Sequence, residues 1–379
     1  MTPPILRRAS GGPPAPRHAW PVAVPHGGPD YAELAGLGLQ AESLIDFSVN
    51  CNPLGASPRA MRALSSVDPS RYPDRQALRL RAGLAAAHDV SPDDVLAGNG
   101  STELIWLLAS VYLDPGDVAV VVGPTFGEYE AAIRRRRAEP VIVRASAADG
   151  FRPRLEELVG VIQETRPRLV FVCNPNNPTG QALTSDELAV LLAACDETLL
   201  IVDEAYRDFA DGLASALELR SDPRVVVLRS LTKSFGLGGL RLGYTIAQPS
   251  VIEAVQRAQP PWSVNAAAQT AGLAALGDTA HVAAGRQLAR RAKAYLVDGL
   301  GRLGLRCLPS CTSFWLVEVG DAAELRRQLL VRGILVRDCS SFGLPKHIRL
   351  AARPLAQCEK LLSVLEYLYR DREGAGARI

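Results

Sequence analysis

Residues 169–180 read Leu-Val-Phe-Val-Cys-Asn-Pro-Asn-Asn-Pro-Thr-Gly, an apolar run that changes abruptly into a polar, turn-forming loop. An apolar run without alternation is typical of a strand buried on both faces, as in a parallel sheet covered by helices. Comparable runs occur at Val118–Val122, Val141–Val143, Leu199–Val202, Val225–Leu228 and Leu242–Ile246, with helix-like stretches between them. This alternation predicts an α/β domain with a mostly parallel sheet flanked by helices.

The C-terminal part of the sequence predicts a second, smaller domain. A long helical region at 251–303 is followed by short strand-like runs that alternate with helices, which favours an α+β arrangement. We therefore expect a large domain at 46–270 and a small C-terminal domain at 271–379. An N-terminal arm at 1–45 precedes them, and its proline-rich residues 1–25 are predicted to be disordered.

The composition excludes several classes of partner. The 42 basic and 40 acidic residues leave a net charge of +2, too small to attract nucleic acid or an anionic membrane. No apolar run approaches the ~20 residues that span a bilayer. The seven cysteines show no metal-type pairing and no disulfide framework, so we expect a cytoplasmic protein without a metal. Only four residues are lysines, so chemistry that needs an amine has few candidates: Lys233, Lys293, Lys346 and Lys360.

Polar side chains follow several of the predicted strands, where a simple core would not place them. The segments are Asn174–Gly180, Asp203-Glu204-Ala205-Tyr206 and Ser230-Leu231-Thr232-Lys233, with Arg241 beyond, and Gly98–Glu103 precedes a helical run. Taken singly, each segment is equally well explained as a turn or a helix cap. Because the carboxyl ends of parallel strands form one edge of a sheet, together they predict a ligand site there.

The residue types at these strand ends match what pyridoxal phosphate requires. Lys233 supplies the amine for a Schiff base, whereas the other lysines lie in charged or turn segments and are expected on the surface. Asp203 supplies a carboxylate that keeps the ring nitrogen protonated, and the protonated ring is the electron sink. Asn177 and Tyr206 are expected to donate hydrogen bonds to the phenolic oxygen of the cofactor.

The cofactor also needs a cradle for its phosphate and a partner for its ring. A helix start with hydroxyls and an arginine binds phosphate well, which favours this set: Gly100, Ser101, Thr102, Ser230 and Arg241. Phe126 is expected to stack on the ring face, although an ordinary core aromatic explains it equally well.

The order of these motifs resembles the fold-type I pyridoxal phosphate aminotransferases (class I/II, aspartate aminotransferase-like), from about His26 to Arg353. The resemblance implies a sheet of about seven strands and a homodimer in which each active site borrows a tyrosine for the cofactor phosphate. Tyr72, in Arg71-Tyr72-Pro73-Asp74, matches that tyrosine, and an ordinary loop tyrosine is the alternative.

Arginines in the predicted small domain suggest an anionic substrate. Arg349 matches the position that binds a substrate carboxylate in this superfamily, and Arg337 matches a phosphate contact in the histidinol-phosphate aminotransferase branch. Together they predict a phosphorylated amino acid as the small-molecule partner. Arg353 is a third candidate, and a solvated strand edge is the alternative for Arg337 and Arg353.

The N-terminal half resembles a second branch, the L-threonine-O-3-phosphate decarboxylases of cobalamin biosynthesis. The resemblance rests on His26-Gly27-Gly28 and on residues 44–55, which read Leu-Ile-Asp-Phe-Ser-Val-Asn-Cys-Asn-Pro-Leu-Gly. It implies that His26 and Asn52 contact the substrate phosphate. The function expected from it is decarboxylation of L-threonine O-3-phosphate to (R)-1-amino-2-propanol O-2-phosphate and CO2, for the cobalamin linker.

Two alternatives remain at the level of sequence. One is an aminotransferase that acts on histidinol phosphate or another amino acid, because the same residues serve both reactions. The orientation of the substrate decides which bond at Cα lies perpendicular to the ring and breaks. The other is a catalytically silent binding protein, against which the presence of Lys233 and Asp203 argues.

Overall fold

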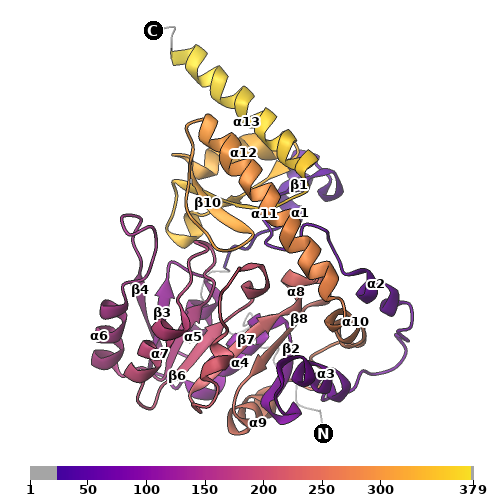
Figure 1. The fold of residues 1–379 in the computed structure, drawn as a ribbon, viewed down its shortest axis with the longest axis vertical. Coiled ribbons are helices and arrows are strands. Elements are labelled where there is room, and N and C mark those ends of the chain that lie inside the picture. The colour runs from indigo at the N-terminus through magenta and orange to yellow at the C-terminus, as the bar shows by residue number, and fades with distance from the viewer. Residues whose placement is uncertain (1–23, 377–379) are drawn as a thin grey trace, which may run out of the picture.

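The computed structural model describes residues 24–376 and contains a large α/β unit below a smaller α+β unit (Figure 1). The large unit is built on a seven-stranded sheet in the order β2-β8-β7-β6-β5-β3-β4. Its strands are β2 (Val95–Asn99), β3 (Val118–Gly123), β4 (Glu139–Arg144), β5 (Leu169–Cys173), β6 (Leu199–Asp203), β7 (Val225–Ser230) and β8 (Leu242–Ile246). The predicted α/β fold is confirmed.

Two features of this sheet differ from the sequence analysis. Strand β8 is antiparallel to both of its neighbours, so the sheet is mixed. Strand β2 was not predicted, because Val-Leu-Ala-Gly-Asn is short and ends in residues that are typical of loops.

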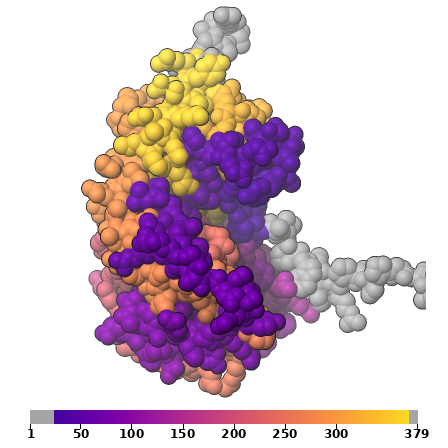
Figure 2. Space-filling view, turned by 90° about the vertical axis from the view of Figure 1, so that its right-hand side faces the viewer, coloured from indigo at the N-terminus to yellow at the C-terminus, as the bar shows by residue number. Residues whose placement is uncertain are grey.

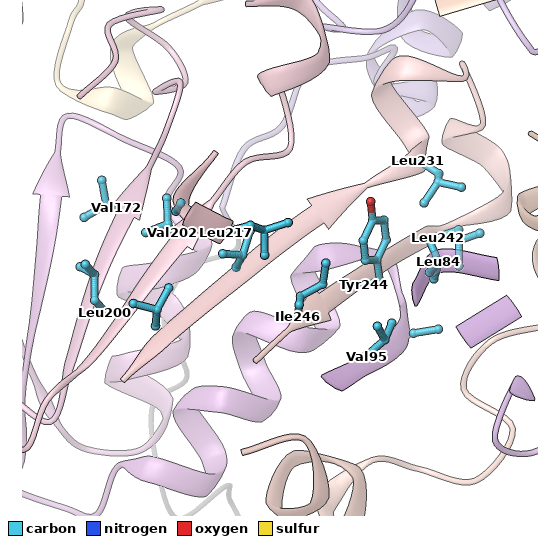
Figure 3. Packing of buried hydrophobic residues seen from close by; sticks show 14 of the residues in the cluster. Leu84, Val95, Val172, Leu200, Val202, Leu217, Leu231, Leu242, Tyr244 and Ile246 are labelled. Atoms are coloured by element: carbon cyan, nitrogen blue, oxygen red, sulfur yellow. The ribbon is translucent and has the colours of Figure 1, made fainter. Parts of the chain in front are cut away.

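Helices cover both faces of the sheet. One face packs on α3 (Leu78–His88), α6 (Leu155–Thr165), α7 (Ser185–Ala194) and α10 (Ala266–Leu276), and the other on α4 (Gly100–Tyr112), α5 (Glu128–Arg135) and α9 (Pro249–Ala258). Successive residues of one strand alternate between the two cores: Val120 and Val122 belong to the first, Ala119 and Val121 to the second. Figure 3 shows part of the first core, including Tyr244 and Leu242 of β8.

The small unit contains an antiparallel sheet in the order β12-β13-β10-β9. The strands are β9 (Arg306–Cys307), β10 (Phe314–Glu318), β12 (Arg337–Asp338) and β13 (His347–Ala351), packed with α11 (Thr279–Arg302), α12 (Ala322–Leu330) and α13 (Leu355–Gly376). The shorter helices α2 (Pro58–Leu64) and α8 (Leu231–Ser234) belong to the large unit.

The N-terminal segment packs onto the small unit as it approaches the large sheet. Helix α1 (Tyr31–Leu37) is bound there by an ion pair between Glu33 and Arg326, and β1 (Ile45–Asp46) pairs in parallel with β11 (Ile334–Leu335). Helix α10 packs on α2 and α3 of the large unit, and α11 packs on α13 of the small one. We therefore propose that the domain boundary, predicted at residue 270, lies between α10 and α11.

The disorder predicted for residues 1–25 falls almost wholly on residues 1–23, which lie outside the described residues. Between residues 24 and 376, no helix has the length and apolar character needed to cross a membrane.

Candidate active site

A cavity of about 610 Å³ opens at the carboxyl ends of the central strands, below the small sheet. Its wall contains nearly all of the side chains predicted from sequence: His26, Gly100, Ser101, Thr102, Phe126, Asn177, Asp203, Tyr206, Ser230, Lys233, Arg241, Arg337 and Arg349. Residues far apart in sequence meet here because β5, β6 and β7 run parallel and end at one edge.

Asp203, the last residue of β6, is the buried carboxylate of the cavity. Its Oδ1 accepts a hydrogen bond of 3.0 Å from the backbone N–H of Ala205, and its Oδ2 accepts one of 2.8 Å from the Tyr129 hydroxyl. Burial raises the pKa of Asp203, so its ionised form depends on the hydrogen bonds and positive charges around it. Tyr129 was missed by the sequence analysis; its position three residues after Phe126, at the start of a helix, was the available signal.

Two glycines allow an anion-binding corner to form where α4 begins. Gly100 has φ +78°, and a Cβ there would lie 2.8 Å from Nη2 of Arg241. A Cβ on Gly243 of β8 would lie 2.3 Å from the backbone nitrogen of Ser101. The first turn of α4 therefore approaches both β8 and the guanidinium, and its free N–H groups suit a phosphate.

The hydroxyls of Ser230 and Thr232 lie 2.6 Å apart beside this corner, and both line the cavity. Thr232 was not selected from the sequence. Its position between Ser230 and Lys233, in the turn that leaves β7, was the available signal.

Lys233 lies in the single turn of α8, and its Nζ is 5.8 Å from the ring centroid of Tyr206. Its backbone carbonyl accepts a hydrogen bond of 2.9 Å from the N–H of Asn52, which fixes the turn. Tyr206 is buried, and burial raises the pKa of its phenol, so the hydroxyl stays protonated and is able to donate.

Arg349 and Arg337 enter the cavity from the small sheet. The Arg349 guanidinium donates to the side-chain oxygen of Asn177 and to the carbonyl of Ser48. The Nε of Arg349 is buried and has no hydrogen-bond partner in the described part of the chain. Burial lowers the pKa of the Arg349 guanidinium. Arg337 donates to the Pro25 carbonyl at 2.8 Å and to the Ser341 hydroxyl at 2.7 Å.

His26 lines the cavity and is half-exposed. Its Nε2 lies 3.0 Å from Oε1 of Glu128, and its ring lies 5.6 Å from that of Phe126. Glu128 also accepts a hydrogen bond of 2.7 Å from the Trp106 indole. The hydrogen bond to His26, more than the one to Trp106, lowers the pKa of Glu128. Glu128 is therefore an anion, and its carboxylate holds His26 in place.

The family model for class I and II aminotransferases matches residues 42–365. The chain belongs to the class I and II aminotransferase family.

The similarity to individual family members extends over most of the chain. A histidinol-phosphate aminotransferase of Symbiobacterium thermophilum is 41% identical over 335 residues, covering 87% of this chain and 91% of that protein. The crystal structure of histidinol-phosphate aminotransferase from Sinorhizobium meliloti with pyridoxal-5'-phosphate has a TM-score of 0.78 at 25% identity, covering 85% of this chain and 90% of that one. L-threonine-O-3-phosphate decarboxylase from Porphyromonas gingivalis has a TM-score of 0.76 at 27% identity, covering 86% and 99%.

Pyridoxal 5'-phosphate is the cofactor of this aminotransferase family member. The cavity fits it, because a buried carboxylate, an amine and a helix start with clustered hydroxyls lie on one wall. We propose that Lys233 binds the aldehyde carbon, Asp203 the ring nitrogen, and Asn177 and Tyr206 the phenolic oxygen. Gly100, Ser101, Thr102, Ser230 and Arg241 are proposed to hold the phosphate, and Phe126 to stack on the ring.

The structure does not bring Asn52, a predicted substrate contact, to the cavity wall. Its side chain is buried, donates to the Ser234 carbonyl at 2.9 Å and accepts from the Leu54 N–H at 3.0 Å. Both ends of the amide are thus occupied in holding the backbone. Asn50, two residues earlier, lines the cavity instead, and its buried side chain has no hydrogen-bond partner in the described residues.

Three other residues also lie away from the cavity wall. Arg353 donates to the backbone carbonyls of Asp46 and Val49, so it ties the N-terminal segment to the small unit. Tyr72 is 83% exposed, with its ring 4.9 Å from that of Trp262. Lys293, expected on the surface, is partly buried and donates to the carbonyls of Ser310 and Thr312.

Proposed function

We propose that this protein transfers the amino group of a phosphorylated amino compound of the histidinol phosphate type to an oxo acid. The observation that carries the proposal is the pair of buried arginines, Arg337 and Arg349, on the cavity wall. Eight relatives that are 34–41% identical bear the name histidinol-phosphate aminotransferase, which supports transamination over the decarboxylation favoured by the sequence analysis.

Transamination needs one site for two substrates, and two arginines suit that requirement. A phosphorylated amine carries its charge on the phosphate, whereas an amino acid such as glutamate carries a carboxylate at each end. Arg349, held by Asn177 and Ser48, is proposed to bind the nearer anion. Arg337 is proposed to bind the second one. Because guanidinium groups form bidentate bonds to both carboxylate and phosphate, the same pair serves each substrate in turn.

The residues around the reacting carbon have separate tasks. When bound, pyridoxal phosphate supplies a protonated ring that withdraws electrons from the bond that breaks at the substrate Cα. Lys233 is the one amine on the described cavity wall, and we propose that its Nζ takes the proton from Cα and returns it. Asp203 holds a proton at the ring nitrogen, and His26 with Phe126 restricts the entry of water.

Decarboxylation of threonine phosphate is kept as the second candidate because of one observation. His26, from the His-Gly-Gly segment that resembles the decarboxylases, lines the cavity, and the carbonyls of Pro25 and His26 accept hydrogen bonds from Arg337. The arm therefore lies where a phosphate bound to Arg337 would meet it.

One experiment separates the two candidates. The holoenzyme is incubated with histidinol phosphate and 2-oxoglutarate, and separately with threonine phosphate without an oxo acid. Glutamate formed in the first mixture, with no CO2 released in the second, is the result expected. Stoichiometric CO2 and aminopropanol phosphate in the second mixture, with no glutamate in the first, would replace the proposed reaction by decarboxylation.

We further propose that the protein is a homodimer in which Tyr72 of one copy reaches the cofactor phosphate of the other. The large apolar side chains Met61, Tyr72, Leu78 and Trp262 are exposed, and the first three belong to the segment around α2 and α3 that covers the lower part of the face in Figure 2. The rings of Tyr72 and Trp262 are in contact at 4.9 Å, and exposed apolar side chains in contact are typical of an interface between subunits. Sedimentation of the holoenzyme tests the dimer, and a monomer at micromolar concentration would contradict it.

A further inference from the structure

Tyr129 donates the one side-chain hydrogen bond that Asp203 receives within the described residues. The bond is 2.8 Å long, the tyrosine is fully buried and the carboxylate is 4% exposed. The remaining bond to Asp203 comes from the backbone of Ala205. Within residues 24–376, no other side chain therefore adjusts by hydrogen bonding how strongly this carboxylate holds a proton.

The other titratable groups described around Asp203 donate no hydrogen bond to it. Cys173, its partner in register on β5, has a pKa raised to about 12 by burial and then by the charge of Asp203, so the thiol is neutral. Glu204 is paired with Arg229 at 2.7 Å and bonded to Ser215. Lys233 acts on Asp203 through its charge and forms no hydrogen bond to it.

The surroundings of Tyr129 make it a donor only. Burial, and then the charge of Asp203, raise the pKa of its phenol well above the ordinary value, so the hydroxyl keeps its proton. Its ring is stacked 5.1 Å from that of Phe171 and meets the ring of Phe126 edge-on at 5.7 Å. These contacts fix the direction in which the hydroxyl points.

We propose that Tyr129 is a positioning residue that keeps Asp203 ionised and thereby keeps the ring nitrogen of the bound cofactor protonated. The hydrogen bond from the neutral Tyr129 hydroxyl stabilises the ionised form of Asp203. Because of this, the carboxylate attracts less strongly the proton that it shares with the ring nitrogen. Without the hydroxyl, Asp203 becomes a stronger base and the proton moves from the ring nitrogen toward the carboxylate. Transamination and decarboxylation both use the protonated ring of the proposed cofactor site, so Tyr129 has the same role in either reaction.

The test uses the holoenzyme reconstituted with pyridoxal phosphate that carries 15N in the ring, without substrate. Tyr129→Phe removes the hydroxyl and keeps the stacked ring. At neutral pH we expect the 15N resonance to move toward that of an unprotonated ring, because the ratio of the ring-protonated to the carboxylate-protonated form should fall about tenfold, as expected for the loss of a hydrogen bond to a charged group. Tyr244→Phe is the matched control, because it removes another buried hydroxyl, bonded to His88 at 2.7 Å, that does not touch Asp203.

An unchanged 15N chemical shift in Tyr129→Phe overturns the proposal, whatever its activity. If that variant does not load cofactor, 3-fluorotyrosine at position 129 decides the question. Fluorine makes the phenol a stronger donor, so the 15N resonance should move toward that of a fully protonated ring, and a resonance that moves the other way or stays the same contradicts the proposal.

Discussion

Arg337 on β12 is the direct cross-strand partner of Arg349 on β13, so the two guanidinium groups lie on the same face of the small sheet. Both are buried, and neither forms an ion pair with a carboxylate in residues 24–376. Burial and then the charge of Arg349 lower the pKa of Arg337. Like charges in this relationship are destabilising, so the pair is stabilised by an anionic ligand.

The arginine pair predicts that phosphate stabilises the folded holoenzyme. With the cofactor bound, inorganic phosphate should raise the Tm of the wild-type protein by a few degrees, because it binds the native state alone. Arg337→Gln should lose most of this rise. Arg306→Gln, on β9 of the same sheet and exposed, serves as the control and should keep it. An equal rise in Arg337→Gln would show that phosphate binds elsewhere.

The same arginine should distinguish phosphorylated from unphosphorylated substrates. For Arg337→Gln we expect KM for histidinol phosphate to rise at least about tenfold, as expected for a lost bond to a charged group. KM for histidinol, which lacks the phosphate, should change little. Steady-state kinetics with both compounds measure the difference, and an equal rise for both would assign Arg337 a purely structural role.

Lys233 should be the residue that binds the cofactor covalently. After borohydride reduction, the wild-type protein should gain the mass of one cofactor, whereas Lys233→Ala should gain none. Lys293→Ala is the matched control, because Lys293 is also partly buried but binds the carbonyls of Ser310 and Thr312. An adduct that persists in Lys233→Ala would refute the assignment.

Lys293 should matter for stability. Its two bonds hold the loop 309–313, whose Cys311 N–H donates to the Gly180 carbonyl at 2.9 Å, so it ties the Asn174–Gly180 loop to α11. Lys293→Met should lower the free energy of unfolding by about 1–3 kcal/mol, since two partly buried carbonyls lose their donor. Urea unfolding measures this, with exposed Lys346→Met as the control, which should leave the midpoint unchanged.

His88 predicts a pH dependence of stability. Burial lowers its pKa to about 4, below the ordinary value of about 6.5. Between these two pH values the unfolded chain binds the proton and the folded chain does not, so stability should fall as the pH drops from 6.5 to 4 and level off below that. The loss should be about 3 kcal/mol by urea unfolding. His88→Gln should lose less stability over this range, and an identical loss would mean that other groups cause it.

Much of the fold and the site was predictable because it depends on local patterns. Unbroken apolar runs predicted six strands of the large sheet, and each bounding polar segment marked a strand end. What failed were features set by partners distant in the chain: the antiparallel direction of β8, strand β2, the inward position of Lys293 and the structural role of Asn52. In each case the deciding neighbour lies far away in sequence, as His281 and Ser234 do for Asn52.

The sequence by itself determined which chemical groups are available: one lysine, one aspartate and a helix start at strand ends that a parallel sheet must bring together. Only the tertiary structure decided how these groups influence each other. It places Tyr129 against Asp203 and Arg337 opposite Arg349, because α5 packs on β3 and β4 with Tyr129 reaching the end of β6, and β12 pairs with β13. Burial at these contacts removes water, and the strength of each charge then depends on neighbours that no local pattern specifies.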